Sequence, residues 1–152
     1  MPHPALDYLT VRLDVLTNLA KDTASEVYER DHGVSLRELR VLRLAYHTPG
    51  ITQGEVVLHS MLEKTQVSRM ITSLVQRGVL QRQIGAKDAR LVHLHLTPAG
   101  REAVRQCNRI GRRMERSLMA SLDPAEAQVF ERCLVRLTER AMRDAERLRA
   151  AA

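Results

Sequence analysis

Aromatic residues are scarce in this chain: Trp is absent, Phe occurs once, and Phe, Trp and Tyr together make up 3% of the 152 residues. A core with so few large rings must be filled by Leu, Val, Ile, Met and Ala, which suits packed helices. Hydrophobic residues make up 44% of the chain. This length and composition allow one ordinary core and leave little room for two independently folded domains.

Signals for export and for membrane insertion are also lacking. The N-terminus has no basic region followed by an apolar run and a small-residue cleavage site. No stretch reaches the ~18 apolar residues that a membrane-spanning helix needs. We therefore expect a cytoplasmic protein with no membrane partner.

Cysteine is limited to Cys107 and Cys133, and both stand at apolar positions of helical patterns. This placement favours buried, reduced thiols over a disulfide framework, with redox sensing as the alternative.

Motifs of catalysis are missing. No Ser/His/Asp or Cys/His group stands on a recognisable nucleophile turn, and the chain has neither a Gly-rich phosphate loop nor a dinucleotide-binding fingerprint. We expect that the protein is not an enzyme and carries no cofactor.

Positive charge, by contrast, is in excess. The formal net charge is +6 and the pI is about 10.0, which favours a polyanionic partner. The charge is unevenly distributed, because residues 1–34 hold three Lys or Arg against six Asp or Glu, whereas residues 50–100 hold six against three. The middle of the chain is therefore its basic part.

The spacing of the apolar residues predicts helices joined by one hairpin. Helices are expected over residues 5–31, 35–47, 52–58, 63–76, 98–123 and from 124 onward, and strands over 79–84 and 92–96, with the hairpin tip at 85–89. Capping boxes begin at Ser35 and Thr52, Asp123 opens the last helix, and Thr97 caps the helix before it.

This order of elements is typical of a winged helix-turn-helix, in a fold class that is mainly α (α+β). We assign residues 35–100 to that domain, residues 1–34 to an N-terminal dimerisation helix and residues 101–152 to C-terminal dimerisation helices. The three long amphipathic helices have more apolar surface than a small winged helix can cover, which favours a homodimer. Packing of all three within the monomer is the alternative.

The helix over residues 63–76 has a polar face opposite its apolar stripe. That face carries Lys64, Thr65, Gln66, Ser68, Arg69 and Thr72. Arg can grip guanine through two hydrogen bonds, Gln can pair with adenine, and Ser or Thr can reach phosphates or bases. The other interpretation of this face is an ordinary solvated surface, and the hairpin that follows favours DNA.

At the hairpin tip, Lys87 and Arg90 can follow the DNA backbone or enter a narrow minor groove, where the negative potential attracts Arg. Asp88 is better suited to holding Arg90 than to facing phosphate. We therefore predict double-stranded DNA as the partner. A winged helix that binds only protein is the rival interpretation.

Four motifs of the chain, taken in order, resemble the multiple-antibiotic-resistance regulator (MarR) family. They are Ile51-Thr52-Gln53-x-Glu55, Lys64-x-x-Val67-Ser68-Arg69-x-Ile71, Leu74-x-x-Arg77-Gly78-Val79-Leu80-x-Arg82, and Asp88-x-Arg90 leading to Leu96-Thr97-x-x-Gly100. The resemblance covers about residues 5–149. It implies a dimeric transcription regulator, usually a repressor that leaves a pseudo-palindromic operator when a small ligand or an oxidant acts on it.

Three departures from the family pattern bear on operator preference. Val56-Val57 stands where the family often has Leu-Ala, Met61 holds a turn position common for Gly, and Glu63 replaces the usual cap of the reading helix.

A sensor function is less clearly marked. His93 and His95 share a strand face but lack a third ligand, so we predict no metal site, and the reactive first-helix cysteine of the peroxide-sensing branch is absent. The resemblance implies an aromatic carboxylate or a phenol as effector. Candidate contacts are Arg12, Arg40, Tyr46 and His47, which are otherwise surface or interdomain side chains. Redox or metal response on the same fold remains the alternative.

Overall fold

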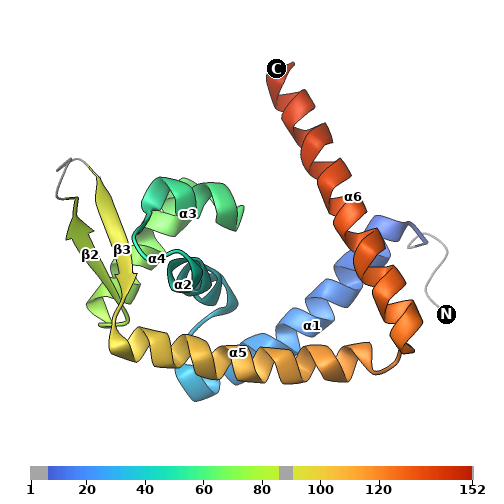
Figure 1. Cartoon of the computed structure of the whole chain (residues 1–152), viewed down its shortest axis with the longest axis horizontal. Coiled ribbons are helices and arrows are strands. Elements are labelled where there is room, and N and C mark those ends of the chain that lie inside the picture. The colour runs from blue at the N-terminus through green and yellow to red at the C-terminus, as the bar shows by residue number, and fades with distance from the viewer. Residues whose placement is uncertain (1–6, 86–90, 152) are drawn as a thin grey trace. The chain divides into compact units, whose positions relative to one another are not determined.

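A computed structural model of the chain describes residues 7–85 and 91–151. The chain forms two compact units, residues 1–111 and 112–152. Its elements are α1 (Leu9–His32), α2 (Leu36–His47), β1 (Ile51–Thr52), α3 (Gln53–Ser60), α4 (Lys64–Gln76), β2 (Leu80–Ile84), β3 (Val92–Leu96), α5 (Pro98–Met119) and α6 (Pro124–Ala150) (Figure 1). The mainly helical winged fold is confirmed, whereas the functional division into three segments stays a prediction.

Local capping sets where the helices begin. Ser35 Oγ accepts a hydrogen bond from the backbone N–H of Glu38 at 3.3 Å, and the Glu38 carboxylate accepts from the N–H of Ser35 at 2.9 Å. Thr52 and Glu55 repeat this reciprocal pair at the start of α3. Because each pair satisfies two N–H groups that have no partner inside the helix, both predicted capping boxes are confirmed.

The sheet has the strand order β1-β3-β2, and both pairings are antiparallel. In the hairpin, Leu80 pairs with Leu96 and Ile84 with Val92, which confirms the predicted strands. The two-residue β1 was not predicted, and its Ile51 pairs with Leu94. The pairing with β1 makes β3 the central strand and ties the start of α3 to the hairpin.

The core lies in the first unit and is aliphatic, as the composition predicts. Its fully buried side chains include Leu39, Leu42, Val56, Val67, Ile71, Leu74, Leu80, Leu94 and Val104. Helices α2 and α4 and the hairpin all contribute to this list. The core therefore fixes the helix-turn-helix pair against the hairpin.

The second unit contains the end of α5 and the whole of α6. Helix α5 ends at Met119, earlier than residue 123, and Asp123 then caps α6 by accepting from the N–H groups of Ala125 and Glu126 at 2.8 and 2.9 Å. No described residue of α6 is buried.

The two cysteines differ in burial, because the core lies in the first unit and no described residue of α6 is buried. Cys107 in α5 is buried, as predicted, but Cys133 in α6 is exposed, so that prediction is wrong for the single chain. The helical pattern identified an apolar face without showing what covers it. Within the described ranges, no helix is both long and apolar enough to cross a bilayer.

Candidate nucleic-acid interface

The turn between α3 and α4 is held by two hydrogen bonds at Ser60. The buried Ser60 hydroxyl accepts from the N–H of Leu62 at 3.3 Å, and the Ser60 carbonyl accepts from the Arg40 guanidinium at 2.9 Å. Met61 follows in the left-handed region with φ 56°. A residue with a side chain is strained there, since glycine adopts this conformation more easily.

Helix α4 presents opposite faces to the core and to solvent. Val67, Ile71 and Leu74 are completely buried. The side chains predicted to face outward are exposed, except for the half-buried Ser68: they are Lys64, Thr65, Gln66, Arg69 and Thr72. Glu63 makes no capping hydrogen bond through its side chain. The structure thus brings all six predicted residues of this helix onto one accessible surface.

A strand residue that sequence reasoning missed extends this surface. The Arg82 guanidinium, from β2, donates a hydrogen bond to the Thr72 hydroxyl at 3.0 Å, and that hydroxyl donates to the Ser68 carbonyl at 3.0 Å. Strand periodicity contains the signal, because Arg82 is two residues beyond the buried Leu80 and side chains two apart share a face.

Beside α4, residues at the start of α2 complete a hollow of about 380 Å³. Its lining is Ser35, Arg37, Glu38, Gln66, Arg69 and Met70. The Arg77 guanidinium, just beyond α4, donates to Glu38 at 2.7 Å and also to the Gly33 carbonyl. This link fixes the end of α4 against the start of α2.

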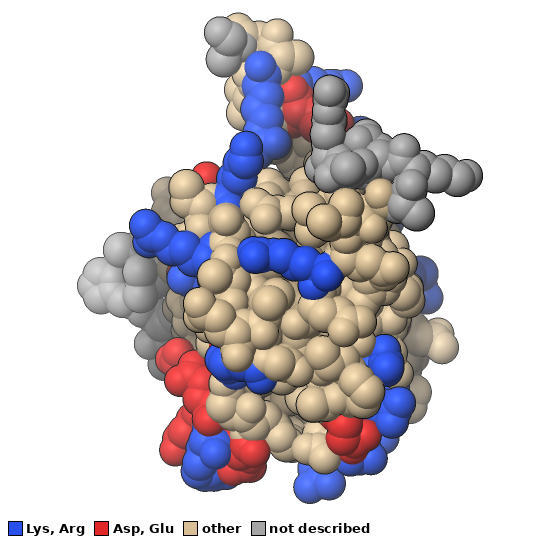
Figure 2. Space-filling model, turned by 90° about the vertical axis from the view of Figure 1, so that its left-hand side faces the viewer, with Lys and Arg blue, Asp and Glu red and all other residues tan. Residues whose placement is uncertain are grey.

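Figure 2 views the molecule from the side on which β2 and β3 lie in Figure 1. Lys and Arg side chains are spread over the middle of this face, and near its lower edge Asp and Glu side chains lie among further Lys and Arg side chains (Figure 2). A surface with this charge distribution is suited to a polyanion. The predicted tip residues Lys87, Asp88 and Arg90 lie outside the described residues.

The predicted effector contacts do not form one group. Arg40 and His47 line a pocket of about 270 Å³ together with Lys21, Leu36, Arg43 and Leu44. Tyr46 instead lines a different hollow, shared with His95 and Arg101. Arg12 forms an ion pair with Asp7 near the start of α1.

The pocket beside Arg40 is basic with an apolar part. Arg40 donates to the Ser60 carbonyl, and Arg43 donates to the Asn108 side chain of α5 at 2.7 Å. Leu36 and Leu44 supply the apolar lining. The combination suits a small organic anion that has an apolar body.

The two histidines of β3 lie beside the backbone at Gly50. His93 Nδ1 lies 2.7 Å from the Gly50 carbonyl oxygen, and the His95 ring lies close to Gly50.

Cys107 of α5 is buried, and this burial raises the pKa of its thiol. A raised pKa lowers the fraction of reactive thiolate.

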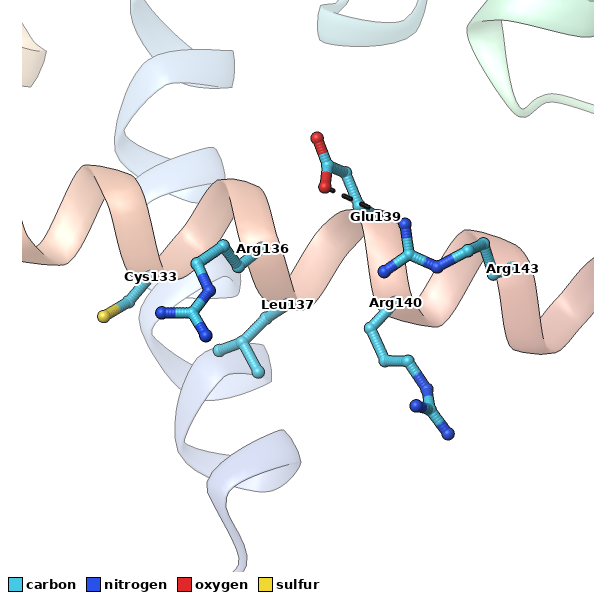
Figure 3. A pocket seen from close by; sticks show the side chains of 6 residues that line it. All are labelled: Cys133, Arg136, Leu137, Glu139, Arg140 and Arg143. Carbon is cyan, nitrogen blue, oxygen red and sulfur yellow. Dashed lines mark ion pairs between the residues drawn. The ribbon is translucent and has the colours of Figure 1, made fainter.

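A larger hollow, of about 470 Å³, runs along α6 between Cys133 and Arg143 (Figure 3). All six lining residues belong to this one helix and are exposed, and Glu139 pairs with Arg143 at 3.9 Å. A hollow beside a single exposed helix has no enclosing wall within that unit. It therefore does not resemble an enclosed ligand site.

Comparison with known proteins finds similarity to one family. Residues 34–92 match the model of the MarR family. The HTH-type transcriptional regulator YdgJ of Bacillus subtilis, itself described as uncharacterized, is 24% identical over 110 residues, which are 72% of this chain and 67% of that protein. The matches to two further curated relatives span 58% and 63% of their lengths.

Solved structures share the fold at low identity. The Staphylococcus aureus MepR–DNA complex has a TM-score of 0.78 and 18% identity, with 88% of this chain and 96% of that chain covered. The Streptomyces coelicolor regulator PcaV, solved with its natural ligand, has a TM-score of 0.71 and 24% identity, with 91% and 94% covered.

Proposed function

We propose that the chain is a transcription regulator of the MarR family, which its residues 34–92 match, and that it binds a pseudo-palindromic operator as a homodimer, with α4 in the major groove. The family assignment agrees with the prediction of a regulator and not an enzyme. The observation that carries the proposal is the polar, accessible face of α4, held rigid by its buried stripe.

Four side chains on that face have a DNA group that they suit. Arg69 can donate two hydrogen bonds to guanine, and Gln66 can pair with adenine. Lys64 and Thr65, near the start of the helix, suit phosphates. Arg90 in the minor groove, oriented by Asp88, remains part of the proposal from the sequence.

The homodimer is supported by apolar surface that the single chain leaves open. On α6, Phe130, Leu134 and Leu137 are 37%, 42% and 51% exposed and recur at helical spacing. Leu16 and Leu19 of α1 are 41% and 64% exposed. Large apolar side chains gathered along helices favour burial against a partner, and a second copy would present the same faces.

DNA binding is tested by measuring affinity for duplex DNA against salt concentration. Neutralised phosphates release counterions, so a DNA reader must lose affinity steeply as salt rises, with a log–log slope of about −0.9 per contact. A winged helix that binds only protein would show no such slope.

Footprinting on selected genomic fragments tests the symmetry of the operator. We expect two half-sites about one helical turn apart. A single unsymmetrical half-site would contradict the dimeric arrangement, even if binding depended on salt as expected.

For the effector, we propose an aromatic carboxylate or a phenolate in the pocket beside Arg40. Its basic side chains Lys21, Arg40 and Arg43 suit an anionic group, while Leu36 and Leu44 suit a ring. Since Arg40 also holds the Ser60 carbonyl before the α3–α4 turn, an anion that draws Arg40 away would loosen that turn. The regulator would then act as a repressor that leaves DNA when the effector binds.

Benzoate and salicylate serve as probes of this pocket, with binding measured by calorimetry. Arg40→Gln should weaken binding of these anions at least tenfold, which is about 1.4 kcal/mol. Arg37→Gln, which removes the same charge from the same helix outside this pocket, is the matched control. Equal affinity of the two variants would place the anion elsewhere.

A further inference from the structure

The contact between Arg82 and Thr72 adds a cation to the α4 surface that no motif singled out as a DNA contact. Arg82 is exposed, and its backbone is fixed by pairing with Leu94 of the central strand β3. Leu94 and Leu80 are both 1% exposed, so the strand around Arg82 is anchored in the core. The backbone that carries Arg82 is therefore anchored to the same core as α4.

Strand geometry explains why this side chain meets α4. Leu80, Arg82 and Ile84 share one face of β2, since side chains alternate along a strand. Leu80 enters the core at the start of that face, and Arg82 lies one step further out. It therefore reaches the helix at its exposed rim, where Thr72 is located.

The Thr72 hydroxyl has one proton and two lone pairs. The proton is donated to the Ser68 carbonyl, and one lone pair accepts from Arg82. Phosphate oxygens only accept hydrogen bonds, so Thr72 has no proton to give them in this arrangement. Arg82, with five N–H donors and a permanent charge, uses one donor in its bond to Thr72.

From this we infer that Arg82 is a DNA-phosphate contact of the reading surface and that Thr72 is the residue that positions it. The inference rests on the proposed DNA binding and changes the role assigned to Thr72, from touching DNA to holding the group that does. A guanidinium fixed at the edge of α4 would set the helix in register on the backbone without reading bases.

The experiment uses the full-length chain and a labelled mixed-sequence duplex of about three helical turns (~30 base pairs), because a phosphate contact does not depend on sequence. Affinity is measured between 50 and 200 mM salt. Arg82→Gln removes one contact per protomer, hence two per dimer, and should reduce the salt slope by about 1.8. Over this fourfold salt range, wild-type affinity should then fall about twelvefold more than that of Arg82→Gln.

Four further variants separate charge from positioning. Arg82→Lys keeps the charge and should keep the wild-type slope, while binding more weakly than wild type. Thr72→Val removes the hydroxyl but no charge, and should weaken binding while leaving the slope unchanged. Thr72→Ser retains the hydroxyl and should bind like wild type. Arg149→Gln, at the end of α6, controls for the loss of one charge.

The experiment separates a failure of this inference from a failure of the proposed DNA binding. If wild type shows no salt-dependent affinity for DNA, DNA binding itself is wrong. If wild type binds and Arg82→Gln has the same slope as Arg149→Gln, the inference is overturned. It is also overturned if Thr72→Val weakens binding while Arg82→Gln does not. Thermal unfolding of each variant checks that it is folded. If Arg82→Gln is not folded, the affinity of Arg82→Lys is the test, and binding as tight as wild type would overturn the inference.

Discussion

Gly100→Ala tests how tightly the hairpin is joined to α5. A Cβ at Gly100 would lie 1.9 Å from the Val79 carbonyl oxygen and 2.9 Å from its carbon. To restore a separation of 3.0 Å the oxygen would have to retreat by about 1.1 Å, the difference between 3.0 and 1.9 Å. The obstacle is backbone, so it cannot swing aside as a side-chain end would.

The expected loss follows from three terms. Forcing a methyl group into a packed site costs about 1–3 kcal/mol. The Val79 carbonyl also accepts from the N–H of Thr97 at 3.2 Å, and weakening that bond costs up to about 1 kcal/mol. The better helix propensity of alanine offsets about 0.5–1 kcal/mol of this loss. The net loss of unfolding free energy is therefore about 2 kcal/mol.

Gly54→Ala is the matched control, because Gly54 is also helical and its added Cβ would meet only the Thr52 hydroxyl, at 4.0 Å. That variant should be as stable as wild type or gain up to about 1 kcal/mol. Urea unfolding at one protein concentration measures both, with a common m-value. Equal stability of Gly100→Ala and Gly54→Ala would refute the clash.

Three other expectations concern DNA reading and thiol chemistry. Arg69→Ala should cost about 1–3 kcal/mol and relax base preference at one position in each half-site, and uniform weakening on all sequences would instead make Arg69 a phosphate contact. Arg90→Ala should weaken binding most on A/T-rich flanks, so equal loss on G/C-rich flanks would exclude the minor-groove role. In the single chain, at protein concentrations too low for the proposed dimer to cover the apolar face of α6, a thiol reagent should modify Cys133 faster than Cys107, which is buried and has a raised pKa. Equal rates would contradict this burial, and Cys133→Ser identifies the fast phase.

Local chemistry explains why several helix starts could be predicted from sequence. The capping boxes at Ser35 and Thr52 involve residues three apart, so the sequence contains both partners of each hydrogen bond. The alternation of Val92, Leu94 and Leu96 likewise identified β3, although Val92 is 37% exposed while the other two are buried. Each of these two patterns lies within a few neighbouring residues and does not depend on a distant partner.

Features that depend on distant partners were not predicted. Strand β1 has two residues, too few to show a period, and exists because β3 pairs with it some forty positions later. The same limit concealed Arg82, whose importance arises only when β2 lies beside Thr72. For Cys133, the period correctly indicated an apolar face of α6 but not that this face is uncovered in the single chain.

Helix α2 connects the proposed effector pocket to the turn between α3 and α4 and to the far end of α4. Its Glu38 accepts from Arg77 beyond α4, and its Arg40 donates to Ser60 before the turn. The turn already contains Met61 in a left-handed conformation, which costs of order 1 kcal/mol for a residue with a side chain. An anion that competes for Arg40 therefore acts beside the most strained backbone of the reading pair, while the Glu38–Arg77 pair still holds the far end. Under the proposed mechanism, the effector would change the angle of α4 by releasing the turn that precedes it, without dislodging the helix from the core.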